Sequence, residues 1–140
     1  MRDFIVYIAG PYRAPTENGV QQNIDRARAA AIEIAEMGLG FFCPHLNSDH
    51  MGGVIPDDEW IEMDLAILRG CCKAILMLEG WKKSTGAARE YHAAFSANIP
   101  IFFTTGGLKA HKDFALPQGE DKIALRADDE YNAVPKLDPC

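Results

Sequence analysis

The run Lys73-Ala74-Ile75-Leu76-Met77-Leu78 decides the fold, because it is apolar at every position after the first. A short, continuous apolar run is typical of a central strand in a parallel sheet, where helices cover both faces. The segments on either side have the alternation that such a sheet needs. Residues 57–69 form a predicted amphipathic helix before the run, and residues 84–97 and 100–104 form a predicted helix and strand after it.

The N-terminal part of the chain shows the same alternation of strand and helix. Residues 3–9 are rich in β-branched and aromatic side chains and end at Gly10-Pro11, which indicates a first strand. Apolar residues recur at helical spacing through residues 19–37, and residues 39–43 form a short second strand. This order, with short connections, predicts a three-layer, doubly wound α/β domain built on a parallel sheet with right-handed crossovers.

The pattern weakens after Gly106-Gly107. Residues 110–114 are predicted to form a helical turn and residues 122–125 a fifth strand. We therefore expect a single domain over residues 1–127, followed by an acidic, loosely ordered tail over residues 128–140.

Composition excludes several classes of protein. The chain has 140 residues, 48% hydrophobic content and a formal net charge of −6, the balance of one compact domain with a real core. A net negative charge argues against a partner such as nucleic acid or an anionic membrane, which clustered Lys and Arg would hold. Apolar runs such as residues 74–78 are too short to span a bilayer, and no signal-peptide core precedes the first strand, so we expect a cytoplasmic protein. The spacing of the four cysteines matches no zinc or CxxC pattern, and we expect neither a metal nor another cofactor.

Ligands of open parallel sheets bind outside the carboxyl ends of the strands. Three predicted loops meet at that edge: residues 10–13, residues 45–56 and residues 79–86. The first loop lacks the GxGxxG spacing of dinucleotide-binding folds, so a smaller ligand is expected. The second loop is polar and Gly-rich and is a candidate substrate lid, with His45 at its mouth as a loop or substrate contact rather than a zinc ligand.

The third loop carries the strongest chemical signal. If Ser84 caps the following helix, the free amides of the first turn and the helix dipole form an anion site, and Gly86 lets an oxyanion approach the backbone. Glu90 lies one helical turn after Gly86, and its side chain leans back toward the helix start. A carboxylate and a bound anion would then lie about as far apart as the anomeric carbon and phosphate of a nucleotide. The alternative is an ordinary helix start with a solvated glutamate.

Two further residues support a site at this edge. Asp64 lies between Met63 and Leu65 and borders an apolar helix surface, although a plain exposed aspartate is the alternative. Tyr7 reads as a core aromatic residue, but a buried phenol needs a hydrogen-bond partner, which a carboxylate at the strand edge would supply.

Taken together, these motifs resemble the nucleoside 2-deoxyribosyltransferase superfamily. The resemblance rests on Ile5-Val6-Tyr7-Ile8-Ala9-Gly10, on Glu62-Met63-Asp64-Leu65 and on Ser84-x-Gly86-x-x-x-Glu90, in that order. It is closest to a small uncharacterised bacterial and phage branch whose members begin with a Tyr-Ile-Ala-Gly-Pro strand and loop. It covers residues 1–103.

The resemblance implies a flavodoxin-like fold of about five strands and a covalent mechanism. Glu90 would take the position of the nucleophilic glutamate, Tyr7 that of the tyrosine that orients it, and Asp64 that of the aspartate that assists base departure or binds sugar. A carboxylate nucleophile suits an oxocarbenium-like transition state, and a nearby acid can protonate the leaving base.

Residue 84 bears on the substrate. In the superfamily, deoxynucleoside transferases carry an aspartate there, whereas nucleoside-monophosphate hydrolases carry a serine that can donate to a phosphate. Ser84 therefore favours a nucleoside 5′-monophosphate. The hydrolases also hold phosphate with the loop after the first strand, which makes Gly10, Tyr12 and Arg13 candidates, although Pro11 removes one backbone donor.

The leading hypothesis is cleavage or transfer at the N-glycosidic bond of a (deoxy)nucleoside 5′-monophosphate, with base, sugar and acceptor left open. The rival is a non-catalytic nucleotide-binding or sensing domain that uses the same pocket, and a third is an assembly subunit with a vestigial site. Because superfamily members commonly complete the site from a neighbouring subunit, we expect a homo-oligomer, at least a dimer.

Overall fold

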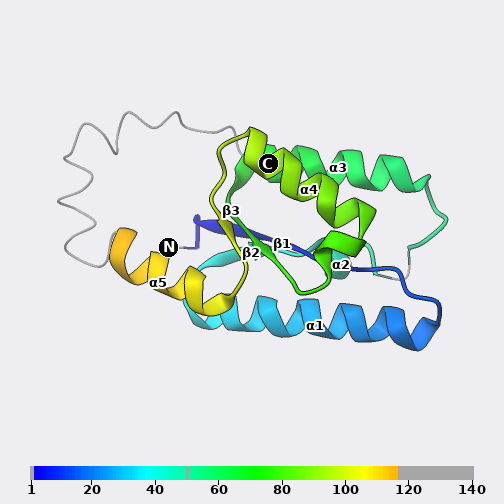
Figure 1. Cartoon of the computed structure of the whole chain (residues 1–140), viewed down its shortest axis with the longest axis horizontal. Coiled ribbons are helices and arrows are strands. Elements are labelled where there is room, and N and C mark those ends of the chain that lie inside the picture. The colour runs from blue at the N-terminus through cyan, green and yellow to red at the C-terminus, as the bar shows by residue number, and fades with distance from the viewer. Residues whose placement is uncertain (1, 50, 117–140) are drawn as a thin grey trace.

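The computed structural model describes residues 2–49 and 51–116, which form a sheet between two layers of helices. Figure 1 shows α1 (Glu17–Glu36) and α5 (Thr105–Ala115) on one face of the sheet, and α3 (Asp57–Cys71) and α4 (Thr85–Ser96) on the other. This arrangement confirms the predicted three-layer, doubly wound α/β fold. None of the helices in the described ranges is long and apolar enough to cross a membrane.

The described sheet has four parallel strands in the order β2-β1-β3-β4. These strands are β1 (Ile5–Ala9), β2 (Gly40–Phe42), β3 (Cys72–Met77) and β4 (Ile101–Phe102). The chain winds outward in opposite directions from β1 and β3, so the crevice at their carboxyl ends is the place where such folds bind ligands. The strand predicted at residues 122–125 and the tail over residues 128–140 lie outside the described residues.

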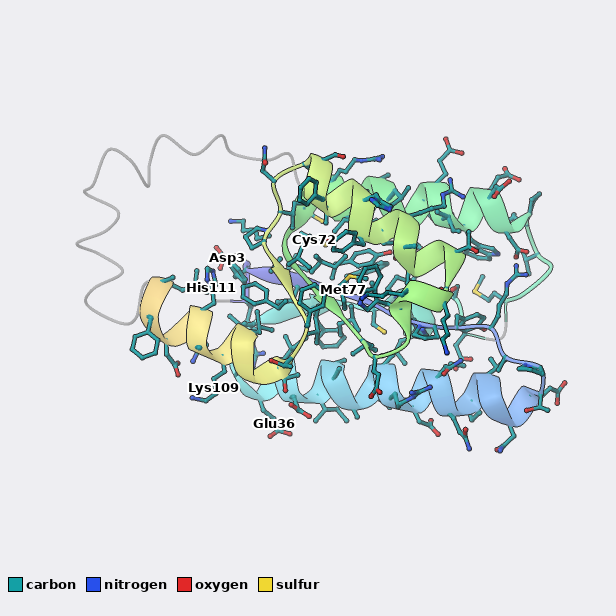
Figure 2. The ribbon with its side chains drawn as sticks, in the orientation of Figure 1. Asp3, Glu36, Cys72, Met77, Lys109 and His111 are labelled. Carbon is teal, nitrogen blue, oxygen red and sulfur yellow. The ribbon has the colours of Figure 1, made fainter. Side chains whose placement is uncertain are left out.

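Alternation of side chains along β1 decides which residues reach the site. Val6 and Ile8 pack with Ile34 of α1 in one core cluster. Tyr7 and Ala9 point to the other face, where α3 and α4 lie. Tyr7 is therefore directed toward the helix that carries Glu90. In Figure 2, Cys72 and Met77 mark the two ends of β3 in the interior, and both are almost fully buried.

Side-chain caps determine where several helices begin, and they explain why two helices begin at other residues than the sequence predicted. Thr16 accepts a hydrogen bond from the Gly19 amide at 3.0 Å, so α1 begins at Glu17 rather than at residue 19. Thr104 accepts from the Gly107 amide at 2.9 Å and starts an eleven-residue α5, where only a turn over residues 110–114 was predicted. Leu108, fully buried, anchors α5 to the core.

Two short helices near the site were not predicted. Pro44, interpreted as a break after the second strand, instead occupies the first turn of α2 (Pro44–Asn47), where its missing N–H is not needed. A single 3-10 turn, η1 (Trp81–Lys83), follows the left-handed Gly80 (φ 87°) and leads into the α4 cap.

Candidate active site

A cavity of about 770 Å³ lies at the carboxyl edge of the sheet. Its walls come from the loop after β1, from α2, and from the N-terminal halves of α3 and α4. Of the predicted site residues, all but Tyr7 line it; these are Gly10, Tyr12, Arg13, His45, Asp64, Ser84, Gly86 and Glu90. Tyr7 lies beneath them and is fully buried. Residues from one loop and three helices are thus brought to one pocket of the size that small molecules occupy.

Glu90 and Tyr7 form the floor of this site. The Tyr7 hydroxyl donates a hydrogen bond to Glu90 Oε2, across the gap between β1 and α4. Glu90 is 8% exposed and is therefore not the solvated helix residue of the alternative interpretation. Burial raises the pKa of Glu90 to about 8; the Tyr7 hydrogen bond works against this rise, and the charge of Asp64 adds to it.

Asp64 is half-buried on α3 and faces the same cavity. Burial raises its pKa to about 6. The pKa of Tyr7 lies far above its ordinary value, chiefly because of burial and then because of the charges of Glu90 and Asp64. Tyr7 therefore remains a hydrogen-bond donor at every working pH, while the two carboxyl groups titrate on either side of neutrality.

The start of α4 offers hydrogen-bond donors to an anion. Ser84 Oγ accepts from the Ala87 amide at 3.2 Å, which leaves its own hydrogen available to donate. The amides of Thr85 and Gly86 fall in the first turn, where helix geometry provides no acceptor. A Cβ at Gly86 would meet Ile61 Cδ1 at an ordinary 3.4 Å, so packing does not require a glycine at this position.

Ion pairs cross the mouth of the cavity. Arg13, from the loop after β1, pairs with Asp57, and Arg89 of α4 pairs with Asp58 at 3.4 Å. Both pairs are largely exposed and contribute little to stability. An anionic ligand would therefore compete with carboxylates for the guanidinium of Arg13.

The cavity wall formed by α3 includes residues that the sequence analysis did not single out. These residues are Asp57, Trp60 and Ile61, which line the cavity together with the predicted Asp64. Their spacing places them on one face of the helix. That stripe was readable in the sequence, since it runs through Asp64, but nothing in the sequence showed that this face was uncovered.

His45 lies on α2 rather than on a loop, and it is 5% exposed. Its Nε2 lies 2.8 Å from the Pro11 carbonyl oxygen, and its ring meets the Tyr12 ring edge-on at 5.5 Å. Burial lowers the pKa of His45, which favours the neutral imidazole. Within the described ranges, no cluster of His, Cys, Asp and Glu side chains could hold a metal ion. The proposed lid includes His50, which lies outside the described residues.

Comparisons with known proteins agree with this architecture. The chain is similar to a solved structure of the 2-deoxyribosyltransferase from the psychrotolerant bacterium Bacillus psychrosaccharolyticus, with a TM-score of 0.51 and 16% sequence identity over 69% of each chain. This likeness confirms a nucleoside 2-deoxyribosyltransferase-like fold. The model of a protein family described as a domain of unknown function, DUF4406, matches residues 4–103. That match covers most of the sequence, and the chain therefore belongs to the DUF4406 family.

Proposed function

We propose that the protein cleaves or transfers the N-glycosidic bond of a (deoxy)nucleoside 5′-monophosphate, with Glu90 as nucleophile. The observation that carries this proposal is the buried Glu90, held by Tyr7 and lining the same cavity as Asp64. The fold likeness to a 2-deoxyribosyltransferase supports the same class of reaction.

The proposed first step divides the work between the two carboxyl groups. The Glu90 carboxylate attacks the anomeric carbon, the bond to the base nitrogen breaks with its electron pair, and the Asp64 carboxyl group gives its proton to the departing base. This leaves a glycosyl ester on Glu90. Water or a second base then attacks the same carbon, returns a proton to Asp64 and frees Glu90.

This step needs Glu90 ionised and Asp64 protonated, so the two groups together must hold one proton. Between pH values of about 6 and 8, the raised pKa values of Asp64 and Glu90 leave one proton on the two groups. Glu90 has the higher of the two pKa values even with the Tyr7 hydrogen bond, so in the free protein this proton lies mainly on Glu90, and the Tyr7 hydrogen bond reduces that preference. The reactive form, with Glu90 ionised and Asp64 protonated, is the minor of the two forms that hold one proton at neutral pH.

A 5′-phosphate is the substrate group that the start of α4 suits best. The amides of Thr85 and Gly86, the Ser84 hydroxyl and the positive end of the helix dipole all favour an anion. Lys83 and Arg13 also line the cavity and add positive charge. Glu90 lies one turn further along the same helix, so binding the phosphate would place the sugar over the carboxylate.

The raised pKa of Glu90 favours a second candidate, a nucleotide-binding domain without turnover, because a protonated glutamate is no nucleophile. One experiment separates the two functions. The purified protein is incubated with a panel of nucleosides and 5′-monophosphates, with and without an acceptor base, and free base is measured by chromatography. We expect base release from at least one monophosphate. A nucleotide that binds in calorimetry and stays intact for hours would favour the binding domain instead.

A further inference from the structure

Two buried polar side chains hold the loop after β1. Asn23 of α1 is 6% exposed, and its Nδ2 donates to the carbonyl oxygens of Tyr12 at 3.0 Å and, in a longer contact, of Arg13 at 3.4 Å. His45 of α2 contacts the carbonyl oxygen of Pro11 through Nε2. Three successive carbonyl groups are therefore engaged by side chains from two different helices.

The partners fix the orientation of both side chains. A carbonyl oxygen can only accept, so Nε2 of His45 carries the hydrogen. The Arg26 guanidinium can only donate, and it donates to Oδ1 of Asn23, which leaves Nδ2 of Asn23 directed at the loop. The edge-on contact between Tyr12 and His45 adds a packing constraint on the same loop.

The contacts to the three carbonyl oxygens also determine where the neighbouring backbone amides point. In a planar trans peptide, the amide of each residue points opposite the carbonyl of the residue before it, and the described chain has no cis peptide bond. The amide of Tyr12 therefore points away from His45, and the amides of Arg13 and Ala14 point away from Asn23. In the described part of the chain, these three amides find no hydrogen-bond acceptor. The residues that carry them line the cavity.

We infer that Asn23 and His45 are positioning residues that set the preference for a 5′-monophosphate over a nucleoside, an inference that rests on the proposed function. By turning three carbonyl oxygens away, they keep the amides of Tyr12, Arg13 and Ala14 aimed at the phosphate before it arrives. Loss of either side chain lets the peptide groups rotate, and a carbonyl oxygen turned toward the anion repels it. Both residues also line the cavity, and the role inferred here acts through the loop that they hold.

The variants are chosen to remove the hydrogen bonds with little change in shape. Asn23→Leu is close to isosteric and adds no charge, and His45→Phe keeps the ring against Tyr12. Gln22→Leu is the matched control, since it makes the same kind of change one residue away on the exposed face of α1. His45→Gln restores a side-chain N–H and tests rescue. Thermal unfolding shows which variants are folded.

The readout is a split between substrates. For Asn23→Leu and His45→Phe we expect KM for the monophosphate to rise about tenfold or more, because hydrogen bonds to a charged group weaken. The kcat for the monophosphate, and kcat/KM for the nucleoside, should change less than about threefold. Gln22→Leu should change neither, and His45→Gln should recover part of the loss. An equal loss for nucleoside and monophosphate would overturn the inference and leave both residues with a merely structural role.

Binding separates a failure of this inference from a failure of the proposed function. Calorimetry with a nucleoside 5′-monophosphate and its nucleoside, in the Glu90→Gln background, needs no turnover. If the wild-type protein releases no base, the proposed function fails. The calorimetric titration still measures whether the loop after β1 favours binding of the monophosphate. Monophosphate binding no tighter than nucleoside binding, or unchanged in Asn23→Leu, contradicts the role of the two positioning residues.

Discussion

At the residue scale, Tyr7, Glu90 and Asp64 form one electrostatic unit. Taking a carboxylate out of water disfavours its charged form, and Glu90 responds with a raised pKa instead of a salt bridge. Tyr7 counteracts part of that rise with a hydrogen bond that only the phenol can donate, since its own pKa is raised well beyond the working range. Near neutral pH the two carboxyl groups therefore hold one proton in total.

This shared proton predicts the pH dependence of the reaction. Below a pH of about 6 both carboxyl groups are protonated and the nucleophile is lost; above about 8 both are ionised and the acid is lost. We expect a bell-shaped profile of kcat/KM with its maximum near neutral pH. Asp64→Asn should lower the rate by about a hundredfold or more and turn the bell into a rise to a plateau, because Glu90 is then the one carboxyl group of the pair that still titrates. A bell that survives in Asp64→Asn would assign the alkaline limb to another group.

Tyr7→Phe tests the hydrogen bond beneath Glu90, the proposed nucleophile. Without the phenol, the pKa of Glu90 should rise further, since Tyr7 is the contact that lowers it. We expect kcat/KM near pH 7 to fall about tenfold or more, with the acidic limb moved to higher pH. Tyr91→Phe is the control, because Tyr91 stacks on Trp81 outside the cavity. An unchanged pH profile in Tyr7→Phe would show that this hydrogen bond does not tune Glu90.

A site residue could be predicted where its role depends on neighbours in the sequence, and not where it depends on a contact with a distant part of the chain. The spacing from Ser84 to Glu90 is a helix-start pattern, and a helix start is visible in one sequence. The role of His45 is set by Pro11, 34 positions away in the chain, and no local pattern records such a contact. Trp60 was missed for a related reason, since amphipathic spacing shows a helix face but not whether that face borders a cavity.

At the element scale, the first turn of α4 has two roles: it is capped by Ser84, and it offers free amides to an anion. Ser84 satisfies the Ala87 amide, and the two amides before it remain available to an anion. Helix α3 runs beside α4 and contributes the opposite wall, from Asp57 at the mouth to Asp64 inside. The cavity therefore depends on how two helix starts lie together more than on any one loop.

Two substitutions at residue 84 separate capping from substrate preference. Ser84→Asp keeps a good cap but places a negative charge at the proposed phosphate site, so thermal stability should be nearly unchanged while KM for the monophosphate rises about tenfold or more. Ser84→Ala loses the cap and should cost about 1 kcal/mol of unfolding free energy. Thermal unfolding and steady-state kinetics with both substrate forms check this. If Ser84→Asp binds the monophosphate as well as the wild type does, the phosphate lies elsewhere.

Element types were easier to predict than element ends. The alternation of apolar strands and amphipathic helices was correct through residue 104, because core burial imposes it. The errors were at helix caps and short helices. Thr16 and Thr104 cap their helices because their side chains accept a backbone hydrogen bond, but threonine is also common in loops, so the sequence alone does not distinguish the two.

At the scale of the whole molecule, the strand order explains why the site is where it is. β1 and β3 are adjacent in the sheet although α1, β2, α2 and α3 lie between them in the chain, and their carboxyl ends open between the two helix layers. The alternation in the sequence predicts this edge. It does not predict the depth of the cavity, which follows from how α2, α3 and α4 pack.

The association state is a separate prediction at this scale. We expect at least a dimer, because the sequence motifs resemble a superfamily whose members commonly complete the site from a neighbouring subunit. Light scattering over a range of protein concentrations, with and without nucleotide, would show a mass of twice that of the chain or more. A strictly monomeric protein that is fully active would rule this out.

The central claim is that Glu90 performs the chemistry, and the rate of base release by Glu90→Gln tests it most directly. Gln still accepts the hydrogen bond from Tyr7, so the variant should fold as the wild type does, and Glu62→Gln on the exposed side of α3 is the matched control. With the monophosphate that the wild type cleaves best, we predict that Glu90→Gln loses about a thousandfold or more in rate while Glu62→Gln keeps it. Base release that persists in a folded Glu90→Gln variant would contradict the account.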